Sequence, residues 1–313
     1  MMMQPSPTTA QRDEPDLVSD PLEHDDDWPV PPGRRVELPG RGTTFVRELP
    51  GPPGAPTLLL HHGWGATGGL NWYRVFDELA RHFRVIAPDL RGHGRGLRSR
   101  RVFRLADCAD DSAALLLELE AAPAIVCGYS MGGPVSQLLW RNNRDLVSGL
   151  VMCATSAGFF PGTRERLVVQ GAMTALAGTL RVGTLASRIP FAVRPVRRSR
   201  HVSLPAWAQA EFRRHDLRLV FEAGHSIGTY HAPWVKEIDV PTTVLVTTND
   251  RLVDPELQYV MAASIPGAET IELPLNHLAC TEDEFAAPLV AACLSVASRA
   301  GVLAAPTRDE TPR

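Results

Sequence analysis

The motif Gly-Tyr-Ser-Met-Gly at residues 128–132 constrains the fold of this chain more than any other feature of its sequence. A short apolar run, residues 124–127, precedes the motif, and a helical pattern follows it. In so tight a strand-to-helix turn the central residue is strained, and the positions two before and two after it are crowded. Gly128 and Gly132 occupy those positions, where only glycine fits easily. The sequence therefore predicts a turn that lifts the Ser130 hydroxyl out of a sheet, at the N-terminus of a helix.

Similar apolar runs alternate with helical patterns along much of the chain. The predicted strands are 43–49, 57–61, 84–87, 124–127, 147–152, 242–246 and 269–273. Short strands rich in Val, Leu and Ile are typical of a sheet buried on both faces. Apolar residues recur at helical spacing from Trp72 to Phe83, with Asn71 as the expected N-cap. The repetition of strand, helix and strand predicts an α/β fold, with a mostly parallel sheet flanked by helices.

The alternation lapses between Ser156 and Ile238 and then resumes. We therefore expect a core of residues 31–155 and 239–304, with residues 156–238 inserted as a mostly helical cap. Residues 1–30 are expected to be a disordered acidic tail, because the first 27 residues hold eight acidic residues and four prolines and have little to bury. Residues 305–313 are expected to be a second disordered tail.

Composition excludes several classes of protein. The 313 residues carry a formal net charge of −3, so the chain has no overall basic footprint and nucleic acid is not an expected partner. No stretch offers the roughly 18 to 20 apolar residues of a transmembrane helix, and the first residues lack the apolar core of a secretory signal. The five cysteines lie mostly in apolar runs, which is typical of reduced, buried thiols. We expect a cytoplasmic protein, and nothing in the sequence indicates its oligomeric state.

Two patterns resemble cofactor or metal sites. Residues 63–68 satisfy GxGxxG, with Asp89 about far enough downstream to hold a ribose hydroxyl, as in dinucleotide-binding oxidoreductases. That site requires a helix that begins inside the glycine motif, whereas the apolar periodicity here begins at Trp72. His24 and the three aspartates after it are interpreted as a solvated charge run, and no zinc or P-loop motif is present. We expect no cofactor and no metal, and keep the oxidoreductase as a remote alternative.

A nucleophilic serine needs a base, and the base needs an orienting acid. After a serine in this kind of turn, the acid precedes the histidine along the chain. His277 is the only histidine after Asp250, and it follows the predicted strand 269–273. Asp250 closely follows the predicted strand 242–246. We therefore expect both side chains at the carboxyl ends of strands, beside Ser130.

Two nearby residues compete for these roles. Asp254 is a rival acid, but its position just before Pro255 favours an N-cap. Cys280 is a rival nucleophile, but it has no base of its own, and we interpret it as a buried packing thiol.

With these residues, the chain resembles the α/β-hydrolases of the serine lipase and esterase type. The matching segments are 61–65, 89–94, 128–133, 249–250 and 276–277. The resemblance implies an oxyanion hole made by the backbone N–H groups of Trp64 and Met131. It also implies that residues 156–238 form a lid over the active site. The usual Gly-His pair of the family is Asn276-His277 here, which leaves the role of the histidine intact.

The resemblance implies a serine hydrolase that cleaves carboxylic esters through an acyl-enzyme. Ser130 takes the position at which haloalkane dehalogenases and epoxide hydrolases of this fold need an aspartate, so both are disfavoured. Carbon–carbon bond hydrolases and haloperoxidase-like perhydrolases use the same three residues, and they remain alternatives. The expected partner is a small-molecule ester.

The expected cap is rich in arginine. Between Arg181 and Val220 there are nine arginines and two acidic residues, interleaved with apolar residues. A basic and apolar cap suits an ester with a hydrophobic acyl chain and an anionic end, or peripheral contact with an anionic membrane surface. An arginine-rich, solvated surface without a ligand is the equal alternative.

Overall fold

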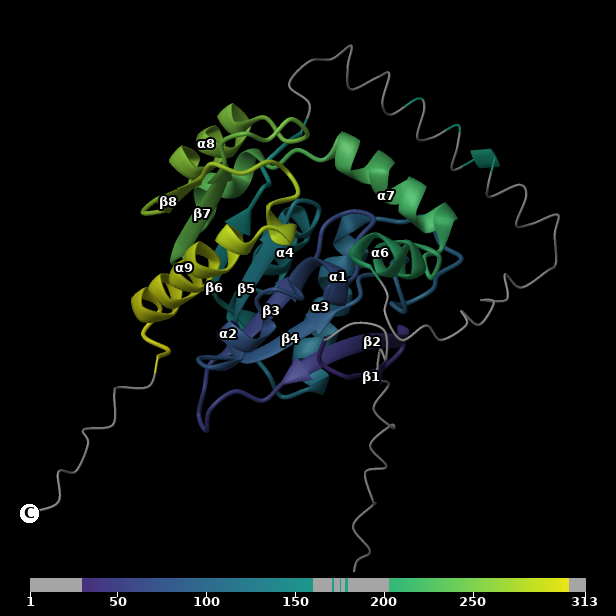
Figure 1. Cartoon of the computed structure of the whole chain (residues 1–313), viewed down its shortest axis with the longest axis horizontal. Coiled ribbons are helices and arrows are strands. Elements are labelled where there is room, and N and C mark those ends of the chain that lie inside the picture. Colours follow the sequence, from purple (N-terminus) through teal and green to yellow (C-terminus); the bar gives the residue numbers. More distant parts are fainter. Residues whose placement is uncertain (1–29, 160–170, 172–174, 176–177, 180–202, 304–313) are drawn as a thin grey trace, which may run out of the picture.

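The computed structural model of the protein describes residues 30–159, 171, 175, 178–179 and 203–303. Within these residues, eight strands form one sheet in the order β1-β2-β4-β3-β5-β6-β7-β8 (Figure 1). The strands are β1 Gly33–Leu38, β2 Gly42–Leu49, β3 Thr57–His61, β4 Arg84–Pro88, β5 Ala124–Tyr129, β6 Val147–Cys153, β7 Thr242–Thr247 and β8 Glu269–Leu273. Pairing is parallel from β4 to β8 across the sheet, and antiparallel for β1 with β2 and for β2 with β4. The predicted fold class is confirmed.

Helices cover both faces of the sheet. The α-helices are α1 Gly68–Trp72, α2 Phe76–Ala80, α3 Leu105–Glu118, α4 Gly132–Asn142, α6 Leu204–Phe212, α7 Leu217–Thr229, α8 Pro255–Ser264 and α9 Ala286–Arg299. Short 3-10 helices are η1 Arg144–Leu146, η2 Pro233–Glu237, η3 Ala279–Thr281 and η4 Asp283–Phe285. Helices α3, α4 and α8 pack on one face, and α1, α2 and α9 on the other (Figure 1).

Alternation along the central strand β3 shows how the sequence builds both layers. Leu59 packs with the first group of helices, whereas Leu58 and Leu60 pack with the second, and all three are fully buried. Burying a leucine side chain contributes about 1.5–3 kcal/mol to stability. A strand that is apolar on both faces is therefore held from both sides, as the unbroken apolar run predicts.

The sequence missed strand β1, and it misplaced one helix boundary. β1 is an edge strand in which only Gly33, Val36 and Leu38 are buried and the other three residues are charged, so its apolar signal is weak. The helix expected between Trp72 and Phe83 is two short helices, of which the first begins at Gly68. Its N-cap is Thr67, whose hydroxyl accepts from the Leu70 N–H at 3.1 Å, so the N-cap prediction for Asn71 is wrong.

A tertiary contact with strand β4 explains why helix α1 begins at Gly68. A Cβ on Gly68 would lie 2.9 Å from the Ala87 carbonyl oxygen, so the first turn of α1 lies directly against β4. The spacing of apolar residues could not predict that the helix begins at Gly68, because glycine has no apolar side chain to contribute to that pattern. The apolar positions Trp72, Phe76 and Leu79 are nevertheless buried as predicted.

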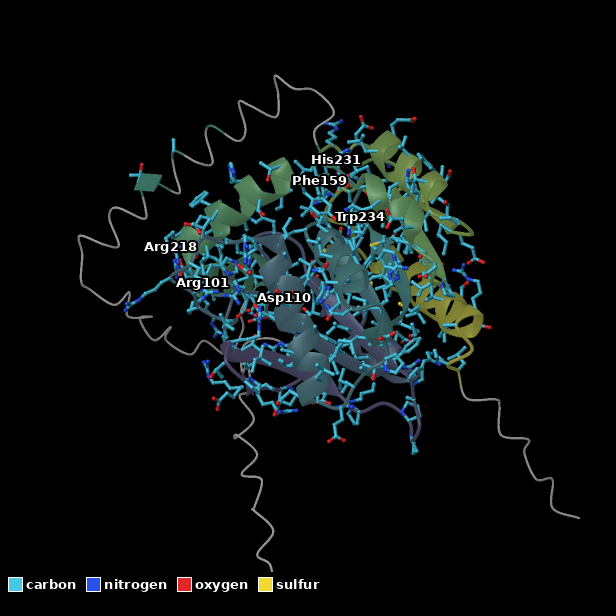
Figure 2. The ribbon with its side chains drawn as sticks, turned by 180° about the vertical axis from the view of Figure 1, so that it is seen from behind. Arg101, Asp110, Phe159, Arg218, His231 and Trp234 are labelled. Atoms are coloured by element: carbon cyan, nitrogen blue, oxygen red, sulfur yellow. The ribbon has the colours of Figure 1, made fainter. Side chains whose placement is uncertain are left out.

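The inserted segment leaves and rejoins the core at one place. Ala232 donates its N–H to the Ala157 carbonyl at 2.8 Å, and Gly158 forms a bridge with His231. Phe159 and His231 lie together in Figure 2. The described part of the insertion after residue 202 is mostly helical, in α6 and α7. Most of residues 160–202, and the expected tails apart from Val30, lie outside the described residues.

Helix α7 is fastened to the loop that follows β4. Arg218 donates to the carbonyl oxygens of Ser99 and Arg101, and it pairs with Glu222 at 3.0 Å. Glu222 in turn accepts from the Phe103 N–H at 2.8 Å. Arg218 and Arg101 lie side by side in Figure 2. The hydrogen bonds that both members of this buried ion pair make with the loop join the insertion to the core.

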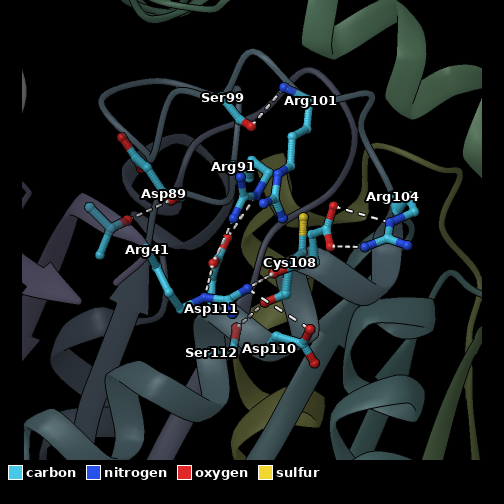
Figure 3. A network of polar contacts seen from close by, with 12 residues as sticks. Arg41, Asp89, Arg91, Ser99, Arg101, Arg104, Cys108, Asp110, Asp111 and Ser112 are labelled. Carbon is cyan, nitrogen blue, oxygen red and sulfur yellow. Dashed lines mark hydrogen bonds and ion pairs between the residues drawn. The ribbon is translucent and has the colours of Figure 1, made fainter. Parts of the chain in front are cut away.

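The same loop is anchored to α3 by a second buried ion pair. Arg91 donates two hydrogen bonds to Asp111, at 2.9 and 2.8 Å, and Arg41 donates a third at 2.6 Å (Figure 3). Only about a tenth of the side chains of Arg91 and Asp111 is exposed. A buried ion pair of this kind is costly to break, because the remaining partner keeps an uncompensated charge.

We predict that Asp111→Asn destabilises the protein by about 3 kcal/mol, because it leaves two arginines facing an uncharged group. Asp110→Asn is the matched control, since its side chain is 45% exposed and lies 3.9 Å from Arg41. The control should cost less than about 1 kcal/mol. Urea unfolding of both variants measures the difference, and equal losses would contradict the assignment of the anchor to Asp111.

Candidate active site

The turn at Ser130 has the geometry that the motif predicts. Ser130 has φ +51°, a left-handed conformation that costs a residue other than glycine about 1–3 kcal/mol. A Cβ on Gly128 would lie 2.5 Å from the Gly132 carbonyl oxygen, and one on Gly132 would lie 2.1 Å from the His61 carbonyl oxygen. The Ser130 carbonyl accepts from the Thr155 hydroxyl at 2.8 Å. Packing and hydrogen bonds together hold the strained turn.

Ser130, His277 and Asp250 form one chain of hydrogen bonds. The His277 Nε2 lies 3.0 Å from the Ser130 Oγ, and its Nδ1 lies 2.7 Å from the Asp250 Oδ2. Because an ionised carboxylate only accepts, Nδ1 carries the proton and Nε2 is the acceptor that faces the serine. The three residues follow β5, β8 and β7, whose parallel directions bring their carboxyl ends to one edge of the sheet.

The surroundings of Asp250 keep it ionised. Burial opposes the charge, but hydrogen bonds from His277 and from the N–H groups of Val253 and Leu252 outweigh it, so the pKa of Asp250 lies below its usual value. The Thr247 hydroxyl donates a further hydrogen bond at 2.8 Å. The carboxylate can therefore orient the imidazole and stabilise its cation.

The rival residues have other roles. Asp254 is the N-cap of α8, as predicted, and accepts from the Glu256 N–H at 3.0 Å. Cys280 is buried, and burial raises the pKa of its thiol to about 11. All five cysteines are free and buried, which confirms the prediction of buried thiols.

The turn after β3 lies against Ser130. A Cβ on Gly63 would be 3.3 Å from the Ser130 Cβ, so the residue before Trp64 lies directly against the serine. Met131, the residue after the serine, is the N-cap of α4, so its N–H lies at the open first turn of that helix. The resemblance implies that the N–H groups of Trp64 and Met131, in these two segments, form the oxyanion hole.

Several supporting residues were not identified from the sequence. The Asn71 side chain accepts from the Gly63 N–H at 2.9 Å. The His62 Nε2 accepts from the Leu90 N–H at 2.9 Å, so its Nδ1 carries the proton and donates to the Gly63 carbonyl at 2.8 Å. Burial lowers the pKa of His62 to about 4, which keeps the ring neutral. Their only sequence signal was their place beside the glycine motif.

Tyr129 holds the backbone of His277 in place. Its hydroxyl donates to the His277 carbonyl at 2.7 Å, and its ring packs edge-on against Trp72 and Phe285. The loop that carries the imidazole is therefore tied to the residue preceding the serine. The sequence offered no signal for this contact, because the two residues lie far apart along the chain.

The geometry of the first glycine motif does not fit a dinucleotide site. The expectation of a late helix start is wrong, since α1 begins at Gly68 inside the motif. However, the Asp89 carboxylate accepts from the Gly68 N–H at 2.9 Å and from the Arg95 N–H at 2.8 Å. Asp89 thus occupies the helix N-terminus at which a pyrophosphate would bind, and it cannot also hold a ribose.

Neither a metal-binding cluster nor a membrane-spanning helix is found among the described residues. No group of three or more His, Cys, Asp or Glu side chains among them is arranged to hold a metal ion. No described helix is long and apolar enough to cross a membrane. His24 and its neighbouring aspartates lie outside the described residues.

Comparisons with known proteins identify the fold family of the chain. The family model described as alpha/beta hydrolase fold matches residues 56–284. A pimeloyl-[acyl-carrier protein] methyl ester esterase of Vibrio vulnificus (strain YJ016) is 36% identical over 111 residues. This match spans 36% of the chain and only 41% of that relative's length.

Two solved structures extend the likeness over most of the chain. A hydrolase from Pseudomonas aeruginosa PA01 is 25% identical with a TM-score of 0.66, and the match covers 84% of this chain and 97% of that one. The enol-lactonase from Burkholderia xenovorans LB400 is 24% identical with a TM-score of 0.65, covering 83% and 99%, and shows the fold alone. Because the family model spans most of the sequence, this chain belongs to the alpha/beta hydrolase fold family.

Proposed function

We propose that this hydrolase cleaves carboxylic esters through an acyl-enzyme on Ser130. The observation that carries the proposal is the continuous chain of hydrogen bonds from Asp250 through His277 to the Ser130 Oγ, at 2.7 and 3.0 Å. A serine whose hydroxyl contacts an imidazole, with a carboxylate orienting that imidazole from its other side, is the arrangement that activates a hydroxyl for attack.

In the proposed reaction, His277 accepts the Ser130 proton as the oxygen attacks the ester carbonyl. The developing oxyanion accepts from the N–H groups of Met131 and Trp64, and a donor of this kind contributes about 2.7–4 kcal/mol to the transition state. His277 then protonates the departing alkoxide. Water, activated by the same imidazole, hydrolyses the acyl-enzyme and restores the serine.

We further propose that the acyl part of the substrate is hydrophobic. Exposed apolar side chains stand at the oxyanion turn and directly after the histidine: Trp64 is 41% exposed and Leu278 is 60% exposed. Phe212 of α6 is also exposed, and it lies beside Gly65. The name of the Vibrio relative, a methyl ester esterase of an acylated carrier, supports an acyl substrate with a small alcohol.

The cap residues expected to contribute are only partly described. Trp207 is buried edge-on against Tyr73 and does not face an open pocket. The remaining apolar residues of that expectation, Val182, Leu185, Ile189, Phe191 and Val193, lie outside the described residues. The proposal for a hydrophobic acyl group therefore rests on the exposed side chains near Ser130.

Replacement of the nucleophile is the first test. Ser130→Ala should lower kcat on p-nitrophenyl esters by about six orders of magnitude, as for other serine triads. A fluorophosphonate probe should label the wild-type protein at Ser130, located by mass mapping, and should not label the variant. A loss of activity below tenfold, with labelling elsewhere, would sink the assignment.

The acid is tested with a matched pair of substitutions. Asp250→Asn should lower kcat by about four orders of magnitude, because the amide holds the wrong tautomer of His277. Asp254→Asn keeps the exposed N-cap of α8, because an amide oxygen can accept the same hydrogen bond, and it should leave kcat nearly unchanged. Steady-state kinetics of both variants decide between them, and the opposite ranking would move the acid to Asp254.

Acyl specificity is tested with a chain-length series of p-nitrophenyl esters. Each methylene buried on binding should raise kcat/KM by up to about fourfold until the site is full, from about 0.8 kcal/mol per methylene. Leu278→Ser should reduce this gain. Leu117→Ser is the matched control, since Leu117 is equally exposed but lies at the far end of α3, before β5. An equal effect of both substitutions would refute the proposed acyl contact.

A further inference from the structure

A cavity of about 540 Å³ opens on the protein away from Ser130, Asp250 and His277. It is bordered by β1, the start of β2, the loop after β4 and the turn between α6 and α7. Its lining residues are Arg35, Gly42, Thr43, Gly94, Arg95, Gly96, Leu97, Arg98 and Arg214. We call it the arginine pocket. Four of the nine lining residues are arginines and none is acidic, although the whole chain carries a net charge of −3.

The arginine pocket lies on the same edge of the sheet as Ser130 but is displaced sideways. β2 runs antiparallel to β4, so the start of β2 lies beside the end of β4, as the hydrogen bond from the Asp89 N–H to the Phe45 carbonyl shows. In the sheet order, β2 is three strand spacings from β5, which is about 14 Å. No lining residue belongs to the hydrogen-bond chain of the proposed active site.

Two of the four arginines are held in place by contacts within the pocket wall. Arg98 donates to the Gly94 carbonyl at 2.7 Å and to the Arg214 carbonyl. The Arg95 guanidinium lies 4.4 Å from the centroid of the Phe45 ring, and only 11% of its side chain is exposed. Fixed guanidinium groups lose less conformational freedom when they bind an anion.

Carboxylates outside the lining of the cavity lie close to its arginines. The buried Glu211 carboxylate lies 3.1 Å from Arg214 and 4.0 Å from Arg95, and it also accepts from the Thr67 hydroxyl. The Glu211 carboxylate thus lies within 4.0 Å of two guanidinium groups. Burial lowers the pKa of Arg98, and Arg35 acts in the same direction, although Asp216 and Asp89 oppose both effects. The lining of the cavity itself contains no carboxylate, so an anion that enters it meets no negatively charged side chain there.

We propose that the arginine pocket binds a phosphate group carried by a small molecule or a headgroup. A phosphate monoester carries about 1.5 to 2 negative charges and three acceptor oxygens, which match several guanidinium forks at once. The Thr43 hydroxyl at the rim supplies a neutral donor. The cavity volume falls within the range of about 300–1,000 Å³ for small-molecule sites, so it admits more than a bare anion. This inference does not depend on the proposed esterase activity.

Calorimetric titration with glucose 6-phosphate, and with glucose as the neutral match, tests the proposal on the full chain. We expect saturable binding of the phosphorylated sugar alone, weakened by added salt because exposed charges are screened. The double variant Arg35→Gln/Arg98→Gln should bind at least about tenfold more weakly, through the loss of charge-assisted hydrogen bonds. Arg81→Gln, at an exposed arginine of the C-cap of α2, should bind like the wild type.

Sedimentation with vesicles that contain phosphatidic acid, or phosphatidylcholine alone, forms the second arm. Binding of phosphatidic acid vesicles that is lost in the double variant, without binding of the soluble sugar phosphate, would identify a lipid headgroup as the source. The single variant Arg35→Gln changes an exposed residue and serves as a second test if the double variant folds poorly. It should weaken binding to whichever ligand the wild type binds, the sugar phosphate or the phosphatidic acid vesicles. Binding in neither arm, or an equal loss in Arg81→Gln, would overturn the proposal.

Discussion

The close approach of three backbone segments beneath Ser130 is the constraint on which the rest of the structure depends. A Cβ on Gly132 would lie 2.1 Å from the His61 carbonyl oxygen, so β3 and the start of α4 can meet only at glycine. Residue 128, in β5, must also be glycine, because a Cβ there would lie 2.5 Å from the Gly132 carbonyl oxygen. Because these segments touch, the serine is raised above the carboxyl edge of the sheet, where the turn after β3 and the loops after β7 and β8 converge on it.

Buried polar groups make this arrangement rigid. Asp250 is fixed by two backbone N–H groups, and the carbonyl of His277 by the Tyr129 hydroxyl. On the other side of Ser130, Asn71 and His62 hold both backbone polar groups of Gly63. In a site of low dielectric constant, such bonds are strong and cost little reorganisation when charge develops. The geometry of the proposed triad therefore also rests on residues outside it.

The loop after β4 joins regions of the molecule that lie far apart along the chain. His215 of the insertion accepts from the Gly94 N–H at 2.7 Å, so its other nitrogen donates to the Gly65 carbonyl at 3.0 Å. One imidazole thus connects a wall of the arginine pocket with the turn that carries the Trp64 N–H. The anchors of this loop to α3 and α7, through Asp111 and Arg218, hold all of these parts against the core.

The sequence by itself determined the strained turn at Ser130 and the core strands, because backbone sterics and apolar burial act over a few residues. It also determined the order of Ser130, Asp250 and His277 along the chain, but only the tertiary structure decided that they meet within hydrogen-bonding distance. The edge strand β1 and the helix start at Gly68 depend on partners distant in sequence, which a local pattern cannot register. The arginine pocket is the extreme case: its charges come from three separate segments, and only the folded chain brings them together.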